Sequence, residues 1–147
     1  MRVRALLLST ALAAGLAPRE LHAQQGDSVT SAIAAAQAAA TSWLALIDQG
    51  DIDASWDSAA SAFRQAVTRP DWSRAVGQAR GSFEPFGARH LLGARYETSL
   101  PNAPPGKYVI LQYETGVSQG RTVVETVVPS LDTDGRWRVG GYFIRPR

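Results

Sequence analysis

Residues 107–131 read KYVILQYETGVSQGRTVVETVVPSL, and this stretch predicts two adjacent antiparallel strands. Val109, Leu111 and Tyr113 alternate with a second set of side chains and therefore share one face of a strand, because successive residues of a strand point to opposite faces. The pair Gln119-Gly120 separates the two strands and is typical of a tight turn. The period of two indicates a sheet in this part of the chain.

The same alternation extends outward over the second half of the sequence. Four strands are predicted, at residues 88–100, 107–119, 121–131 and 136–145. The connections are short and rich in Pro, Gly, Asn and Asp, which favours antiparallel neighbours in chain order. Gly140-Gly141 lies within the last strand and is expected to mark a bend or a bulge.

The first half of the sequence has helical periodicity instead. Apolar residues recur at helical spacing over 29–49, where Asp27 or Ser28 provides a cap and Gly50 provides a left-handed ending. A second helix is expected over 53–67, and a third begins at Thr68 and runs to about residue 83. Helices in one run and strands in another predict an α+β fold, with three N-terminal helices packed on a curved four-stranded antiparallel meander.

The beginning of the sequence resembles an export signal. Arg2 and Arg4 precede the apolar stretch 5–17, and Leu21-His22-Ala23 ends in a small residue suited to cleavage. We expect residues 1–23 to be a signal peptide and residues 24–147 to be a single α+β domain in the periplasm or outside the cell. The apolar stretch is short for a membrane span and is followed by Pro and charged residues, so no span is expected in the mature chain.

Composition excludes several classes of site. The 147 residues include no Cys, and His90 is the one histidine after a leader ending at Ala23. A lone histidine leaves a catalytic triad or a structural zinc site incomplete. We therefore expect no metal and no cofactor. Removing residues 1–23 leaves twelve basic and twelve acidic residues. This balance, without a basic patch, argues against a nucleic-acid partner.

One acid stands out in the predicted sheet. Glu125 lies between Val123 and Val127 on one face of its strand, so burial would raise its pKa if that face lines a pocket. Gln112, Tyr142 and Arg89 are candidates to complete a polar, ligand-binding pocket around it, or to satisfy one another. In the alternative interpretation, Glu125 points to solvent or pairs with Arg95 or Arg138.

Several motifs in one order resemble the bacterial domain-of-unknown-function 4019 family. They are Trp43–Asp48 with Gly50-Asp51, Ala54–Asp57, Ser99–Pro101, Leu111–Thr115, Val124–Thr126, and Gly135–Val139 leading into Gly141–Arg145. The resemblance covers about residues 30–146. It implies an exported α+β domain similar to cystatin-like or nuclear-transport-factor-like cones, and it implies no activity, cofactor, partner or catalytic residue.

Three functions remain open from the sequence. Because complete catalytic machinery is missing, we expect non-enzymatic binding of a small molecule or a protein partner through a concave sheet face. One alternative is a pocket enzyme of hydrolase, isomerase or dehydratase type that uses Glu125 as acid or base, with Tyr142 or Gln112. The other is a structural envelope module that acts by homodimerisation. A deep cavity containing Glu125 would favour the enzyme or ligand binder, and a filled core with an exposed apolar sheet face would favour association.

Overall fold

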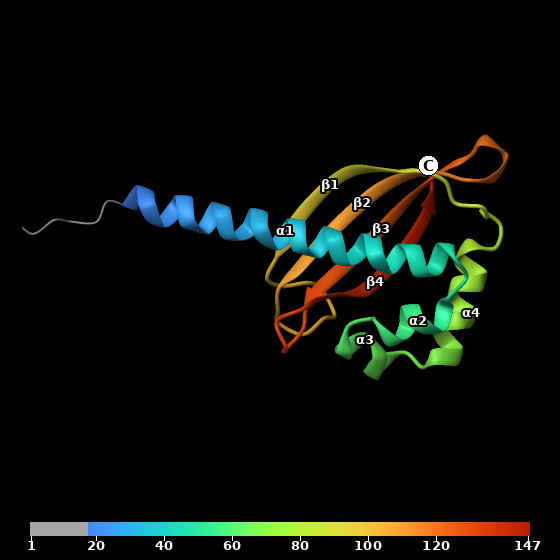
Figure 1. Ribbon diagram of the computed structural model, residues 1–147, viewed down its shortest axis with the longest axis horizontal. Coiled ribbons are helices and arrows are strands. Elements are labelled where there is room, and N and C mark those ends of the chain that lie inside the picture. Colours follow the sequence, from blue (N-terminus) through green and yellow to red (C-terminus); the bar gives the residue numbers. More distant parts are fainter. Residues whose placement is uncertain (1–17) are drawn as a thin grey trace, which may run out of the picture.

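The computed structural model describes residues 18–147, in which helices pack against a four-stranded antiparallel sheet (Figure 1). Over this range the elements are α1 (Pro18–Asp48), α2 (Ile52–Asp57), α3 (Ser61–Ala66), α4 (Arg69–Arg80), β1 (Arg89–Glu97), β2 (Tyr108–Gly116), a short 3-10 turn (Ser118–Gly120), β3 (Thr122–Leu131) and β4 (Trp137–Pro146). The strand order β1-β2-β3-β4 follows the chain. The predicted α+β class and antiparallel meander are confirmed. The sheet is not closed, and the cone-like family shape implied by the resemblance stays a prediction.

Two bulges interrupt the regular alternation of the sheet. In β1, Leu91 pairs with Tyr113 and Gly93 with Gln112, so Leu92 is an extra residue. In β4, Gly141 pairs with Val128 and Val139 with Pro129, so Gly140 is unpaired, as the sequence predicts for this region. Pro129 has no N–H to donate to the ladder, which favours an irregularity at this point. Each bulge reverses which later residues of its strand share a face.

Helix α1 lies across one face of the sheet and extends beyond it at its N-terminal end (Figure 1). Its inner side buries Ala36, Ala40, Trp43, Leu44 and Ile47, the spacing expected for a core helix. At its end, Gly50 has φ +80° and donates to Ile47 O, and Asp51 donates to Leu46 O, as in a Schellman motif. The helix already begins at Pro18, so Asp27 and Ser28 are not its first cap.

The segment Ser28–Asp48 is long and apolar enough to cross a membrane by length and composition alone. A core helix and a signal sequence near the N-terminus have the same property, and we interpret this helix as part of the core because its apolar stripe packs on the sheet. Residues 1–17 of the expected signal peptide lie outside the described residues. An apolar helix near the N-terminus is compatible with a signal sequence.

The single helix predicted over 53–67 is two short helices, which gives four helices over residues 18–147 where the sequence predicts three. The chain leaves the helical conformation at Ala60, whose N–H donates to Val139 O in β4. Ser61 then donates through its backbone N–H and its hydroxyl to the carboxylate of Asp132. These hydrogen bonds to the sheet replace the helical ones, and local helix propensity does not reveal them.

Helix α4 begins as the sequence predicts. The Thr68 hydroxyl accepts from the Asp71 N–H, and Pro70 lies in the first turn. Its buried Trp72 packs 5.6 Å from Trp43, centroid to centroid, and its indole N–H donates to Ser55 Oγ. The Trp43 indole N–H donates to Ser55 O, so both indoles are core residues with their polar atoms satisfied. Trp56 and Trp137 are partly buried against the same core.

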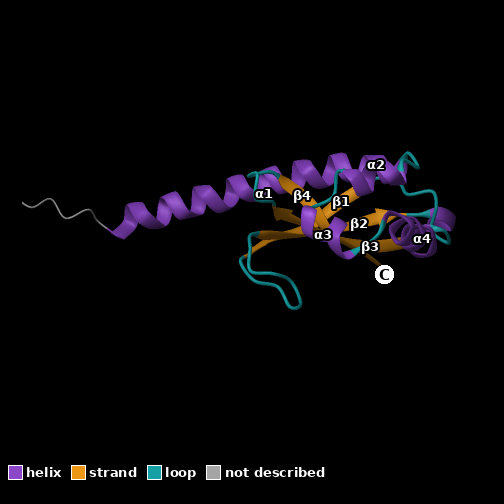
Figure 2. Cartoon of the chain, turned by 90° about the horizontal axis from the view of Figure 1, so that it is seen from below, coloured by secondary structure: helices purple, strands orange, loops and turns teal. Residues whose placement is uncertain are grey.

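The two faces of the sheet have different surroundings. The helix-covered face, which carries Val109, Leu111, Tyr113, Glu125 and Val127, lies under α1 and forms the core. The opposite face, called here the open face, carries Tyr108, Ile110, Gln112, Thr126, Val128 and Phe143. Figure 2 shows α1 on one side of the sheet only. This separation positions both candidate sites described below.

Candidate functional site

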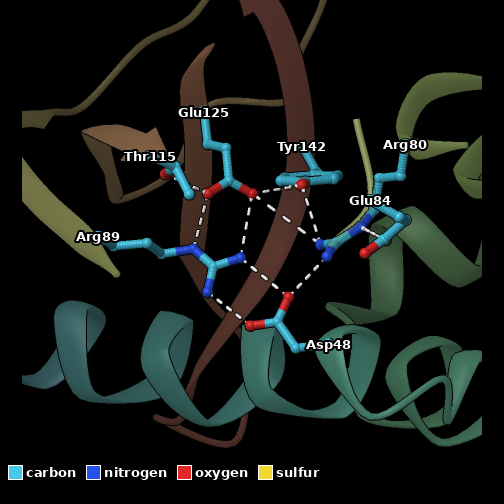
Figure 3. Close-up of polar contacts among 7 residues, drawn as sticks. All are labelled: Asp48, Arg80, Glu84, Arg89, Thr115, Glu125 and Tyr142. Carbon is cyan, nitrogen blue, oxygen red and sulfur yellow. Dashed lines mark hydrogen bonds and ion pairs between the residues drawn. The ribbon is translucent and has the colours of Figure 1, made fainter. Parts of the chain in front are cut away.

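The four residues predicted for a ligand pocket lie on different faces. Arg89, Glu125 and Tyr142 meet between the sheet and α1 (Figure 3). Gln112 is exposed on the open face, because it alternates with the buried Leu111 and Tyr113. The structure therefore brings together three of the four and separates Gln112 from them.

Glu125 is fully buried, and four hydrogen bonds reach its carboxylate. Arg89 donates from Nε to Oε2 at 2.6 Å and from Nη2 to Oε1 at 3.2 Å. The Thr115 hydroxyl donates to Oε2 at 2.6 Å, and the Tyr142 hydroxyl donates to Oε1 at 2.5 Å. The partner is thus Arg89, and neither Arg95 nor Arg138 takes this place.

Further residues that the sequence analysis did not select extend this cluster. Asp48, at the end of α1, accepts from Arg89 Nη1 at 2.6 Å and from Arg80 Nη2 at 2.7 Å. Arg80 is 2% exposed, donates from Nε to Glu84 at 2.8 Å, and lies over the ring of Phe86. We call the set Asp48, Arg80, Glu84, Arg89, Thr115, Glu125 and Tyr142 the buried ionic network. It connects α1, α4 and the segment after it with all four strands.

The sequence contains a signal for part of this network. Trp72, Val76 and Arg80 follow one another at intervals of four, which places Arg80 on the buried side of α4. Asp48 lies four positions after the buried Leu44, so it continues the buried stripe of α1 to the end of the helix, where its side chain is 29% exposed. Charged residues that continue a buried helical stripe indicate an ionic partner in the core, since buried charges are almost always paired.

Hydrogen bonds and neighbouring charges within the buried ionic network keep its arginine and aspartate groups ionised and its tyrosine protonated. Burial opposes the charge of Arg89, but hydrogen bonds to Asp48 and Glu125 outweigh it and raise the pKa of Arg89. Burial and the Glu125 charge raise the pKa of Tyr142, so its hydroxyl keeps the proton that it donates. For Asp48, burial is again outweighed by hydrogen bonds from Arg89 and Arg80, and its pKa is lowered. The groups are fixed partners of one another, which suits a structural connection.

A hollow of about 550 Å³ lies on the open face. We call it the apolar groove. Its walls come from α3, from the loop over residues 100–104 and from β2, β3 and β4, and they include Phe63, Val67, Pro101, Tyr108, Ile110, Val128 and Phe143. None of its lining residues is charged. The volume falls within the range of known small-molecule pockets.

A second hollow of about 240 Å³ adjoins the apolar groove, and Ile110 lines both. Its other lining residues are Gly93, Ala94, Arg95 and Gln112. We call it the polar hollow. Gln112, predicted as a ligand-binding residue, therefore lies beside a hollow of the open face. Glu125 lines neither hollow.

Among the side chains that the structure describes, those of residue 26 and residues 28–147, no group of three or more His, Cys, Asp or Glu could hold a metal ion. His90 is exposed on β1. The acids of the buried ionic network, Asp48, Glu84 and Glu125, each accept hydrogen bonds from arginine.

Comparisons with known proteins identify the family of the chain. Residues 39–142 match the family model described as "Protein of unknown function (DUF4019)". This segment contains every residue of the buried ionic network. No curated protein and no solved structure matches the chain.

Proposed function

The chain belongs to the DUF4019 family, and we propose that it is a non-enzymatic binding protein that takes up an apolar group in the apolar groove of its open face. The observation that carries this proposal is the groove itself, about 550 Å³ in volume and lined without any charged residue. Hollows of this size and lining are the usual form of a small-molecule site.

The exposure of Phe143 supports the proposal. Its side chain is 64% exposed beside the groove, next to Val128 and Gly141. An aromatic ring contributes most to stability when it is buried, so an exposed ring on the wall of a hollow is better explained by a ligand that covers it.

The alternative of a pocket enzyme based on Glu125 lacks comparable support. A general acid or base must reach the proton that it transfers, directly or through one water. Glu125 is fully buried and held by Arg89, Thr115 and Tyr142. We propose that this acid fixes the scaffold on which the open face is built.

Export is part of the same proposal. The basic start of the sequence, the apolar stretch 5–17 and the small residue Ala23 support secretion to the periplasm or beyond. A chain without cysteine needs no disulfide-forming system there.

The test is titration with a neutral apolar fluorescent probe, N-phenylnaphthylamine, using the purified chain lacking residues 1–23. We expect saturable binding of the probe. Gly141→Val should weaken this binding at least about tenfold, because the valine side chain would take up space in the groove that the probe needs. A Cβ at Gly141 would lie 3.3 Å from the ring of Phe143 and 3.4 Å from Val128 Cβ, on the groove wall.

Gly116→Val is the matched control. Gly116 ends β2 on the same sheet, lies outside both hollows, and a Cβ there would meet no atom within 4 Å. Equal binding by the wild-type chain and Gly141→Val would contradict the proposal. A dimer that dissociates in Gly141→Val, without probe binding, would support homodimerisation instead.

A further inference from the structure

We infer that the ligand of the apolar groove is a single-chain amphiphile with a carboxylate head, whose alkyl chain lies in the groove and whose head lies at Arg95 and Gln112. This inference rests on the proposed function and adds the chemical class of the ligand. It assigns the polar hollow to the head group and the groove to the chain.

The first support is that the two hollows are neighbours on the open face. Ile110 lines both, and the register places Arg95 opposite Ile110 on the open face, with Val128 and Gly141 continuing the same row on β3 and β4. A ligand that follows this row crosses the strands from β4 to β1, a distance of about 14 Å at a strand spacing of about 4.8 Å. An extended acyl chain suits such a path better than a compact ring system does.

The second support is the change of chemistry along that path. The apolar groove has no charged lining residue, whereas the polar hollow has the guanidinium of Arg95 and the amide of Gln112. Arg95 is 71% exposed and uses Nε for its ion pair with Glu97 at 2.7 Å. Within the described residues its two terminal nitrogens form no ion pair, and a guanidinium with both of them available matches the two oxygens of a carboxylate.

The third support is the absence of a side chain at Gly93. This residue pairs with Gln112 and lines the polar hollow, and a Cβ there would meet no atom within 4 Å. The hollow is therefore open above the backbone beside Arg95. A larger residue at this position would occupy the space assigned to the head group.

The experiment compares dodecanoate with dodecanol, each below its micelle concentration, as competitors of bound N-phenylnaphthylamine at neutral pH. The two ligands share an alkyl chain and differ in the head. We expect the wild-type chain to bind dodecanoate about three- to tenfold more tightly, the range of a partly exposed charge-assisted hydrogen bond.

Charge variants assign this preference to a residue. Arg95→Gln is expected to remove the preference for dodecanoate and to leave dodecanol binding unchanged. Glu97→Gln removes the acid that competes for Arg95 and is expected to strengthen dodecanoate binding. Arg145→Gln is the matched control, because Arg145 is an exposed arginine of β4 outside both hollows.

The outcomes separate this inference from the proposed function. Displacement of the probe by both ligands with equal affinity, unchanged in Arg95→Gln, overturns the carboxylate assignment and leaves the apolar groove as a binding site. An equal loss in Arg95→Gln and Arg145→Gln also overturns it, since general surface charge would then explain the preference. If the neutral probe itself does not bind, the proposed function fails as well.

Discussion

Each face of the sheet carries an exception to the usual distribution of polar and apolar groups. Under α1, the core contains a fully buried carboxylate and an arginine that is 2% exposed. On the open face, Phe143 is 64% exposed beside an uncharged groove. Charged groups of β3 and α4 thus lie inside, and an aromatic ring of β4 lies outside.

This contrast assigns different roles to the two faces. The helix-covered face specifies the fold, and the open face is the proposed binding surface. A buried ion pair adds little net stability over well-packed apolar residues, but removing one partner is costly. The buried ionic network therefore penalises any arrangement of α1, α4 and the sheet that separates its members. The open face has no such constraint, so its side chains can change with little effect on folding.

The largest expected effect is in the buried ionic network. Arg89→Met removes the guanidinium that binds both Glu125 and Asp48 and leaves two acids without it, one of them fully buried. We expect the free energy of unfolding to fall by about 3–5 kcal/mol, measured by urea titration at neutral pH. The matched control Arg95→Met, on the exposed side of the same strand, should change it by no more than about 0.5 kcal/mol.

A loss below about 1 kcal/mol in Arg89→Met would break the comparison, because the network would then carry no more weight than a surface ion pair.

A smaller effect is expected from acid. Burial would raise the pKa of Asp48 from its ordinary value of 3.8, but hydrogen bonds from Arg89 and Arg80 outweigh burial and lower it. As the pH falls, the unfolded chain takes up this proton first, so the stability that Asp48 contributes is present above about pH 4 and is lost as the pH falls through the folded-state pKa.

Asp48→Asn removes this titration. The variant should melt at a lower temperature at neutral pH, and its melting temperature should fall less steeply than that of the wild-type chain below about pH 4. If the melting temperatures of the two proteins fell in parallel with pH, the acid sensitivity would arise from groups other than Asp48.

The smallest effect on stability is expected on the open face. Phe143→Ala removes a ring that is 64% exposed, so the free energy of unfolding should change by less than about 1 kcal/mol, while affinity for N-phenylnaphthylamine falls about fivefold or more. Phe86→Ala is the opposite control. It removes the ring that covers Arg80 and should reduce stability without changing probe affinity. The reverse result for either variant would contradict the division between the faces.

Much of the fold follows from periodicity alone. The helical stripe through Ala36, Ala40 and Trp43 and the alternation through Val109 and Leu111 each give an element and its buried side. The break of the second helix at Ala60 does not follow, because hydrogen bonds to Val139 and Asp132 cause it. Such contacts join residues distant in sequence and leave no local pattern.

The site is predictable to a smaller extent for a geometric reason. In a regular strand, Arg89 and Arg95 would share a face, because they are an even number of positions apart. The extra residue Leu92 places Arg89 under α1 with Glu125 and Arg95 on the open face. Sequence alternation alone could select Glu125 as unusual, but it could not choose which arginine meets it.

The bulge at Gly140 has the corresponding consequence at the other edge of the sheet. Val139 and Tyr142 are three positions apart, so an uninterrupted strand would send them to opposite sides. The unpaired Gly140 offsets the alternation of side chains in β4 by one position, so both side chains lie on the side of α1. The same one-residue offset places Phe143 on the open face. A single glycine thereby determines which of two neighbouring aromatic rings completes the interior and which faces solvent.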